Sequence, residues 1–353
     1  MKVPFALVLI IFLFMSAYAA PHEEGSLSIF LTYRGLYDNN LLKYSPRDRG
    51  EYLDSIENHQ SPIRSLDDFR SDYKISLDYD IELLKNSKSK LRSIFNFAQH
   101  LQDPIKNLGW ASFYLEQDIG SRLSTSINYF VEPRYYIRDY KDKHTNEYHS
   151  ADFALNQWTW NLTYRPMYLL EIGGDIRLKN YYYNEYFTEF DGNLWQTGAE
   201  VILREGPWKA TMNLSYAQFE NTGFNALDRL PPYDDIEDNE SGNSSYEENE
   251  FNIEIQHNVK LWGRRTYTRI SGSLAKRFYS SNLLPEIDPL HHGRSDEVVT
   301  TGISMKQNLN KILSIEAGWE YSQRDSKASH PLAHILKTYY RWGSWIELTY
   351  RLR

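Results

Sequence analysis

The chain has 353 residues, a formal net charge of -8 and no cysteine. A negative net charge disfavours a nucleic-acid partner, because binding to phosphates requires a basic face. The lack of cysteine excludes disulfides, thiolate metal sites and a lipid-modified N-terminal cysteine. No residue pattern predicts a cofactor. Aromatic residues make up 15% of the chain and include 28 Tyr and 9 Trp, the side chains that settle at membrane interfaces.

The N-terminus has the order of a secretory signal peptide. Lys2 precedes an apolar run over residues 3–14, and small residues follow up to Ala19 and Ala20. We therefore predict a signal peptide over residues 1–20 and one mature domain over residues 21–353. An uncleaved anchor helix is the alternative, although the apolar run is short for crossing a membrane.

Beyond the signal, apolar and polar residues alternate with the period of β strands that have two different faces. The pattern is clearest over residues 73–83 and over residues 167–219, where runs of about 10 to 12 residues have the length that a tilted strand needs to cross a bilayer. A tight turn is predicted at residues 205–207 and a β-bulge near Asn156. The other strands are predicted over residues 26–34, 91–100, 111–115, 123–137, a segment ending at 164, 251–261, 270–274, 299–305, 313–321 and 336–352.

The breaks between strands are of two kinds. Those after strands 2, 4, 6, 8, 10 and 12 are mostly short, whereas those after strands 1, 5, 9 and 11 are long and polar. Short turns at one end and longer loops at the other are typical of transmembrane β-barrels with both termini in the periplasm. We predict an all-β fold, a single antiparallel up-and-down transmembrane barrel of about 14 strands, with 12 as the alternative count.

These features, together with the final strand from Trp345 to Arg353, resemble those of a bacterial outer-membrane β-barrel protein. The resemblance is architectural and covers nearly the whole mature chain. It implies outer-membrane lipid around the barrel and recognition of the C-terminal strand by the barrel-insertion machinery. That strand usually ends in an aromatic residue, whereas this chain ends in Leu352 and Arg353.

The alternation predicts a polar face that lines a wet lumen. One interpretation is a charge-lined pore for passive passage of small polar solutes, and the other is that the charges pair across neighbouring strands. No plug domain precedes the first strand. The charged residues predicted on this face are Lys74, Asp78, Asp80, Glu82, Glu132, Arg134, Glu171, Asp175, Arg177, Lys179, Glu200, Glu254, Arg269, Glu316, Lys337, Arg341 and Glu347.

Two long segments are candidates for a role beyond connection. Residues 37–70 are long enough to fold into the lumen and constrict it, or they form a solvated outer loop. Residues 220–250 are acidic, and Glu237, Asn239, Ser241, Gly242 and Glu248 loosely match the spacing of a calcium-binding loop. The match is poor, and we predict no specific metal site.

Enzymatic and display functions are the alternatives to a pore. Asp142, Lys143 and His144 resemble the Asp-x-His pair of omptin proteases, although Asp78 and Asp80 are placed too deep to complete such a site. An outer-membrane phospholipase needs a lipid-facing Ser and His, and only His257 is predicted on that face. We therefore predict no enzyme. A barrel that only displays adhesive loops, and a secreted β-sandwich, are the remaining alternatives.

Overall fold

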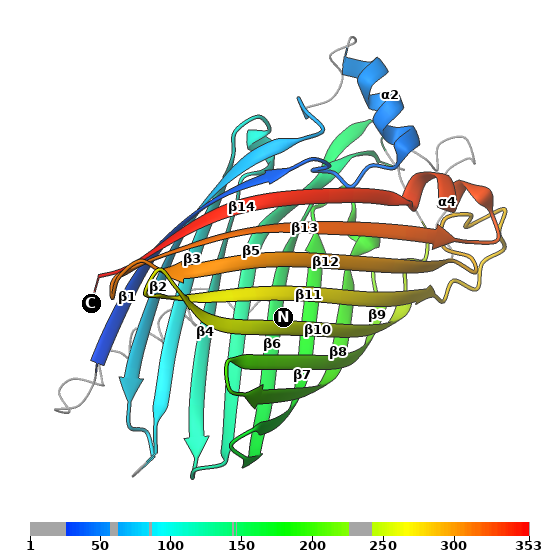
Figure 1. Ribbon diagram of the computed structural model, residues 1–353. Coiled ribbons are helices and arrows are strands. Elements are labelled where there is room, and N and C mark those ends of the chain that lie inside the picture. Colours follow the sequence, from blue (N-terminus) through cyan, green and yellow to red (C-terminus); the bar gives the residue numbers. More distant parts are fainter. Residues whose placement is uncertain are drawn as a thin grey trace.

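The computed structural model describes residues 26–56, 63–84, 87–142, 145, 147–225 and 242–352. Fourteen strands form one closed barrel in which each strand pairs antiparallel with its neighbours in the chain and β1 pairs with β14 (Figure 1). The strands are β1 (Ser26–Asp38), β2 (Asp68–Ile81), β3 (Ser89–His100), β4 (Leu108–Ile119), β5 (Leu123–Lys141), β6 (Tyr148–Met167), β7 (Leu170–Tyr183), β8 (Gly192–Glu205), β9 (Trp208–Asn221), β10 (Tyr246–Leu261), β11 (Arg264–Tyr279), β12 (Ser295–Asn308), β13 (Leu313–Lys327) and β14 (Tyr339–Arg351).

Closure of the sheet confirms the predicted fold class and settles the strand count at fourteen rather than twelve. Strands of 12 to 20 residues exceed the usual length in soluble proteins. An even number of antiparallel strands, joined in sequence order and closed so that no edge is left, is the architecture of outer-membrane barrels. The predicted architectural resemblance is therefore confirmed by the geometry.

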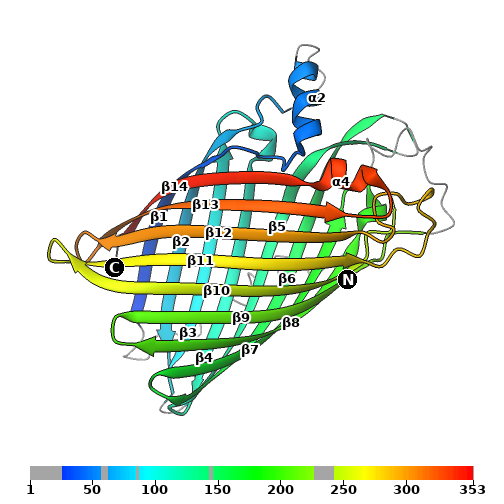
Figure 2. The ribbon, with the colours of Figure 1, turned by 45° about the vertical axis from the view of Figure 1, so that its right-hand side comes forward.

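The connections are mostly short at one end of the barrel and mostly longer at the other. At the short-turn end they are residues 82–88, 120–122, 168–169, 206–207, 262–263 and 309–312, and β14 ends there too (Figure 2). Trp262 and Gly263 both have positive φ, as a two-residue type I′ hairpin requires. The long-loop end carries residues 39–67, 101–107, 142–147, 184–191, 222–245, 280–294 and 328–338.

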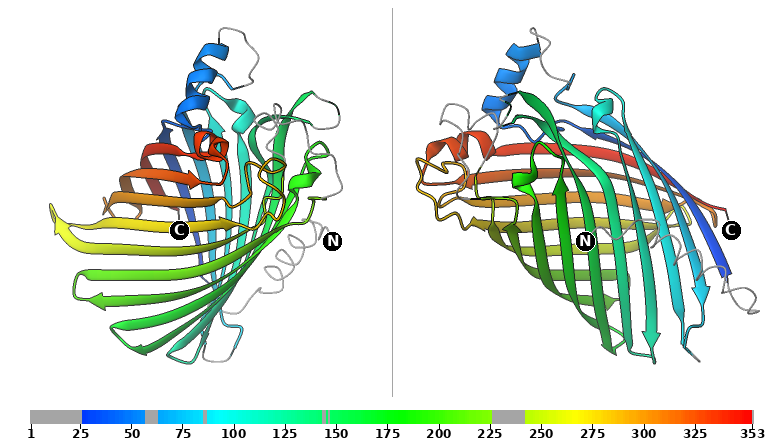
Figure 3. Two further views of the ribbon diagram at one scale, coloured as in Figure 1. Left: turned by 90° about the vertical axis from the view of Figure 1, so that its right-hand side faces the viewer. Right: turned by 180° about the vertical axis from the view of Figure 1, so that it is seen from behind.

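Helices occur only in connections at the long-loop end among the described residues. They are α2 (Pro46–Ile56), η1 (Pro104–Lys106), η2 (Thr188–Phe190) and α4 (Pro331–Lys337). Ser45 and Asp48 bond reciprocally to each other's backbone N–H, and this capping box starts α2. Figure 3 shows α2 standing above the rim of the barrel. No helix in the described ranges is both long and apolar enough to cross a membrane.

Two buried apolar clusters tie these connections to the barrel. Leu42, Tyr52 and Ile63 of the first connection pack with Tyr136 of β5. Leu290 of the 280–294 connection packs with residues of α4, namely Leu332, Ala333 and Leu336. The long-loop end is therefore a packed layer in its described parts.

Three local predictions were wrong. Asn156 pairs in register on both sides, and the irregularities lie in β5, where extra residues fall between Glu132 and Tyr135 and between Tyr136 and Arg138. The connection after strand 5 is not long, because β5 runs on to Lys141 and β6 begins at Tyr148, which leaves residues 142–147. The last strand begins at Tyr339, since Pro331 starts α4 directly before it. The predicted signal peptide lies outside the described residues.

Candidate functional site

Successive residues of each strand alternate between an outward and an inward face. On β10 the outward side chains of Phe251, Ile253 and Ile255 are 36 to 42% exposed, so Glu250 and Glu254 point inward. The phase and register of the other strands place these predicted residues on the same inward face: Lys74, Asp78, Asp80, Glu132, Glu171, Asp175, Arg177, Lys179, Glu200, Glu254, Arg269, Glu316, Arg341 and Glu347.

Charges on this inward face pair across neighbouring strands. Asp78 of β2 accepts two hydrogen bonds of 2.8 Å from its register partner Arg92 of β3. Further pairs join Glu254 to Arg269 at 3.3 Å, Glu248 to Arg277 at 2.8 Å and Glu320 to Arg341 at 3.3 Å. Cross-strand pairing, one of the two interpretations of the sequence, is therefore present, and it keeps the inner wall polar without leaving those charges isolated.

One contact on this wall joins two acids directly. Glu316 of β13 and Glu347 of β14 are register partners, an arrangement that like charges disfavour. Arg269 lies 3.9 Å from Glu316, and Arg34 of β1 is the register partner of Glu347 on its other side. The two carboxylates are thus flanked by guanidinium groups. The result is a charged band from β10 across to β1, in which two adjacent acids lie between arginines.

Three predicted lumen residues do not belong to this face. Arg134 lies in the bulged part of β5 and pairs at 3.1 Å with Asp152, which shares the outward phase of Trp158. The prediction for Arg134 was wrong because extra residues in β5 reverse its phase. Glu82 follows the end of β2, and Lys337 is the last residue of α4.

The same bulge turns Tyr135 inward, where it joins a row of aromatic side chains that sequence reasoning missed. We call this row the aromatic arc. Neighbouring ring centroids are 5.1 to 5.8 Å apart, and the rings are Tyr135, Phe153, Tyr181, Phe219, Tyr246 and Tyr279. The sequence analysis placed most aromatic residues on the outward face. These six rings come from six different strands, so their proximity depends on the register between strands.

The connection from β1 to β2 begins with a tight turn over residues 39–45 at the long-loop end. Asn40 is fully buried, and its side-chain amide donates to the carbonyls of Tyr44 and Tyr340 at 3.0 Å each. Its Oδ1 accepts from the backbone N–H of Tyr44 at 2.9 Å. Asn40 therefore fixes residues 39–45 against β14. Part of the segment for which a lumen-entering fold and an outer loop were the alternatives lies at the rim, and α2 stands above it (Figure 3).

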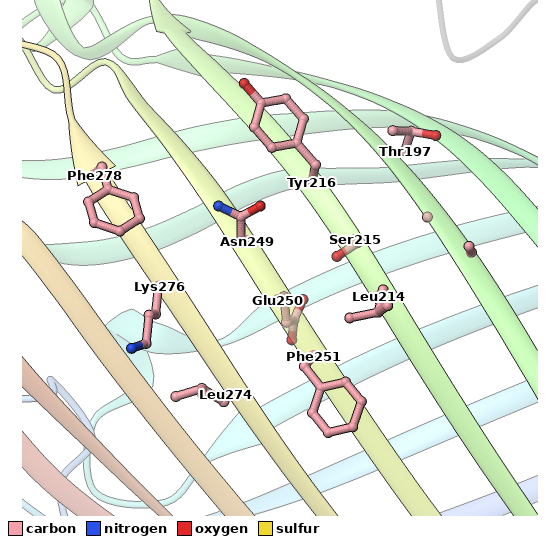
Figure 4. Close-up of a pocket in the computed structure, with 12 residues that line it drawn as sticks. Thr197, Leu214, Ser215, Tyr216, Asn249, Glu250, Phe251, Leu274, Lys276 and Phe278 are labelled. Carbon is pink, nitrogen blue, oxygen red and sulfur yellow. The ribbon is translucent and has the colours of Figure 1, made fainter.

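A groove of about 620 Å³ lies on the outward face across β8 to β11. Figure 4 shows the apolar side chains that line it, with Lys276 on the same face of β11. The lining includes Leu214, Tyr216, Phe251, Leu274 and Phe278. Because it opens away from the inward face, this groove is not part of the candidate pore.

Chains of similar architecture are found among solved structures. They include the outer membrane channel DcaP of Acinetobacter baumannii (11% identity, 94% of this chain and 99% of that chain, TM-score 0.47) and OmpT, an outer membrane protein of Vibrio cholerae (6%, 94% and 99%, 0.45). A third is the anion-selective porin from Comamonas acidovorans (8%, 93% and 100%, 0.44). At such identities the likeness concerns the fold alone. No family model and no curated protein matches the chain.

The residues of the enzymatic alternative are far apart or engaged elsewhere. Asp80 accepts a hydrogen bond from Ser26 at the short-turn end, whereas Asp142 lies at the long-loop end. Lys143 and His144 lie outside the described residues. His257 points outward and stacks on Trp208 at 4.2 Å, and its register partners are Trp208 and Thr268, neither of which is a serine.

The loose calcium-loop match also finds little support. Glu237, Asn239 and Ser241 lie outside the described residues, and Glu248 pairs with Arg277. No cluster of three or more His, Asp or Glu residues that could hold a metal ion occurs in the described ranges.

Proposed function

We propose that this protein is a bacterial outer-membrane pore through which small polar solutes pass passively. The proposal rests on one observation: the outward face of the closed barrel is apolar and its inward face is charged. Ile270 and Leu214, on the outward face, are 57% and 61% exposed. Contact of such apolar side chains with water is unfavourable, whereas contact with lipid is not. The inward face carries the paired charges described above, which suit a water-filled interior.

The lumen-lining role belongs to the inward charges named in the previous section. Because Arg92, Arg269 and Arg341 are already bound to carboxylates, most of the wall presents compensated charge. Such a wall attracts hydrated solutes without holding them tightly, which conduction requires. We propose no cofactor, no nucleic-acid partner and no catalytic residue for this function.

The proposed orientation places both termini in the periplasm. Ser26 and Arg351 lie at the end with the short turns, and short turns are periplasmic in outer-membrane barrels. Export through the N-terminal signal peptide and recognition of β14 by the barrel-insertion machinery complete the proposal. β14 is the strand that closes the barrel against β1.

Two measurements on the detergent-solubilised protein test the proposal. A closed barrel should migrate differently on a gel before and after boiling, and the unboiled form should give discrete single-channel steps in planar bilayers. Boiled protein is the control and should be silent. Folded protein without conductance would instead support a display barrel, and turnover of a peptide or phospholipid would support the hydrolase.

A further inference from the structure

The turn at residues 39–45 holds a lysine in an unusual backbone conformation. Lys43 has φ of 55°, in the left-handed region that non-glycine residues seldom adopt, and its N–H donates to Asn40 O at 3.1 Å. Arg138 of β5 donates to the carbonyl of Leu42 at 3.4 Å. The turn is thus held from β14 by Asn40 and from β5 by Arg138, so that Lys43 is presented by a fixed backbone.

The Lys43 side chain is exposed to water, but its electrostatic neighbours are on the inward face of the wall. They are Arg341 of β14, Arg324 of β13, Arg277 of β11 and Asp38 of β1. Lys106 of η1 is also within electrostatic range. Because these strands lie on a large arc of the barrel, the ammonium group sits within the opening at the long-loop end rather than outside the rim.

The neighbouring charges do not cancel Lys43. Arg341 is paired with Asp38 and Glu320, Arg324 with Asp296, and Arg277 with Glu248. No carboxylate in the described part of the chain forms an ion pair with Lys43. Among these described groups, Lys43 is therefore the basic group without a carboxylate partner.

We propose that Lys43 is the residue that makes this pore prefer small anions over small cations. An uncompensated ammonium in a confined aqueous opening attracts anions and repels cations, as in pores lined by Lys or Arg. The inference rests on the proposed pore function and assigns its selectivity to one side chain. The turn provides the rigid support that such a filter needs.

Reversal potentials in a KCl gradient across planar bilayers test this assignment. The wild type should pass chloride in preference to potassium. Lys43→Asn removes the charge and suits the backbone, because Asn tolerates positive φ, and it should lower the chloride to potassium permeability ratio at least about two-fold. Lys43→Arg should keep the ratio. Lys311→Asn, at the short-turn end, is the matched control and should leave the ratio unchanged.

The pH dependence of the permeability ratio provides a second, independent test. The surrounding protein crowds the Lys43 ammonium group and partly desolvates it although water still reaches it, and this, with Arg341 and Arg324, lowers its pKa to about 8. The wild-type ratio should therefore fall as pH rises from 6.5 to 9.5, and the fall should be much smaller in Lys43→Asn. Lys106, whose pKa is also lowered by burial, is present in both the wild type and Lys43→Asn.

The outcomes separate this inference from the proposed function. A folded barrel that does not conduct would overturn the pore and the inference together. A conducting barrel whose permeability ratio is the same in wild type, Lys43→Asn and Lys43→Arg would overturn the role of Lys43 alone. Gel mobility before and after boiling establishes that each variant is folded.

Discussion

Asp38 of β1 holds Arg341 of β14 across the seam where the barrel closes, with Oδ2 3.5 Å from Nη1. The other oxygen, Oδ1, accepts the backbone N–H of Asn40 at 3.0 Å. One buried carboxylate therefore supports both the wall and the turn that presents Lys43. Its two roles can be separated by substitution.

Asp38→Asn should remove the ion pair but keep an acceptor for Asn40, whereas Asp38→Ala should remove both interactions. Arg341 retains Glu320 at 3.3 Å, so we expect Asp38→Asn to lower the free energy of unfolding by about 1 kcal/mol. Asp38→Ala should cost about 1 kcal/mol more. Urea unfolding in detergent measures both. Equal losses would show that the bond to Asn40 contributes nothing.

Adjacent residues on β10 test the assignment of faces at one depth. Ile253 points outward and Asn252 inward, with Asn213 and Ser273 as the register partners of Asn252. Ile253→Arg should cost about 2 to 4 kcal/mol on insertion into bilayers, and Asn252→Arg much less. The measurement is the denaturant midpoint of folding into lipid vesicles. Similar penalties at both positions would contradict the inward and outward assignment.

Arg269 compensates the two acids that meet on β13 and β14. Arg269→Gln removes the contacts with Glu254 and Glu316 and leaves Glu316 beside Glu347. We expect the free energy of unfolding to fall by about 1 kcal/mol, a value limited by the partial exposure of Arg269. Thermal unfolding in detergent measures it. Adding Glu316→Gln should restore part of the loss. Arg265→Gln on the same strand is the control and should have little effect.

Lys106 should make stability depend on pH. Burial is the largest cause that lowers its pKa to about 7, and Arg138 and Lys43 add to the effect. Between about pH 7 and 10 the unfolded chain therefore holds a proton that the folded chain does not. Stability should rise by about 1.4 kcal/mol per pH unit from this group.

The comparison that isolates Lys106 uses Lys106→Met. Its melting temperature should rise less between pH 7 and pH 9.5 than that of the wild type. Lys311→Met, an exposed lysine at the opposite end of the barrel, should follow the wild-type curve. A curve for Lys106→Met that is parallel to the wild-type curve would show that Lys106 stays charged throughout this range.

Alternation of polar and apolar residues assigned side chains to the correct face only where a strand is regular. Regular strands such as β2 and β10 keep one phase from end to end, so Asp78 and Glu254 could be assigned to the inward face from their spacing alone. Arg134 was assigned to the wrong face, because a bulge inserts residues without a clear mark in the sequence and reverses the phase beyond it. Lys337 was misplaced because its spacing fits both the end of a helix and the start of a strand.

The sequence by itself determined that this chain forms a barrel with two chemically opposed faces, since alternation along a strand is a local property of extended backbone. Only the tertiary structure decided which charges meet, because register and closure bring Arg341 to Asp38 from opposite ends of the chain. The same holds for Lys43. Nothing in its neighbouring residues indicates that it shares an opening with arginines of β11, β13 and β14, because that proximity arises only when the sheet closes.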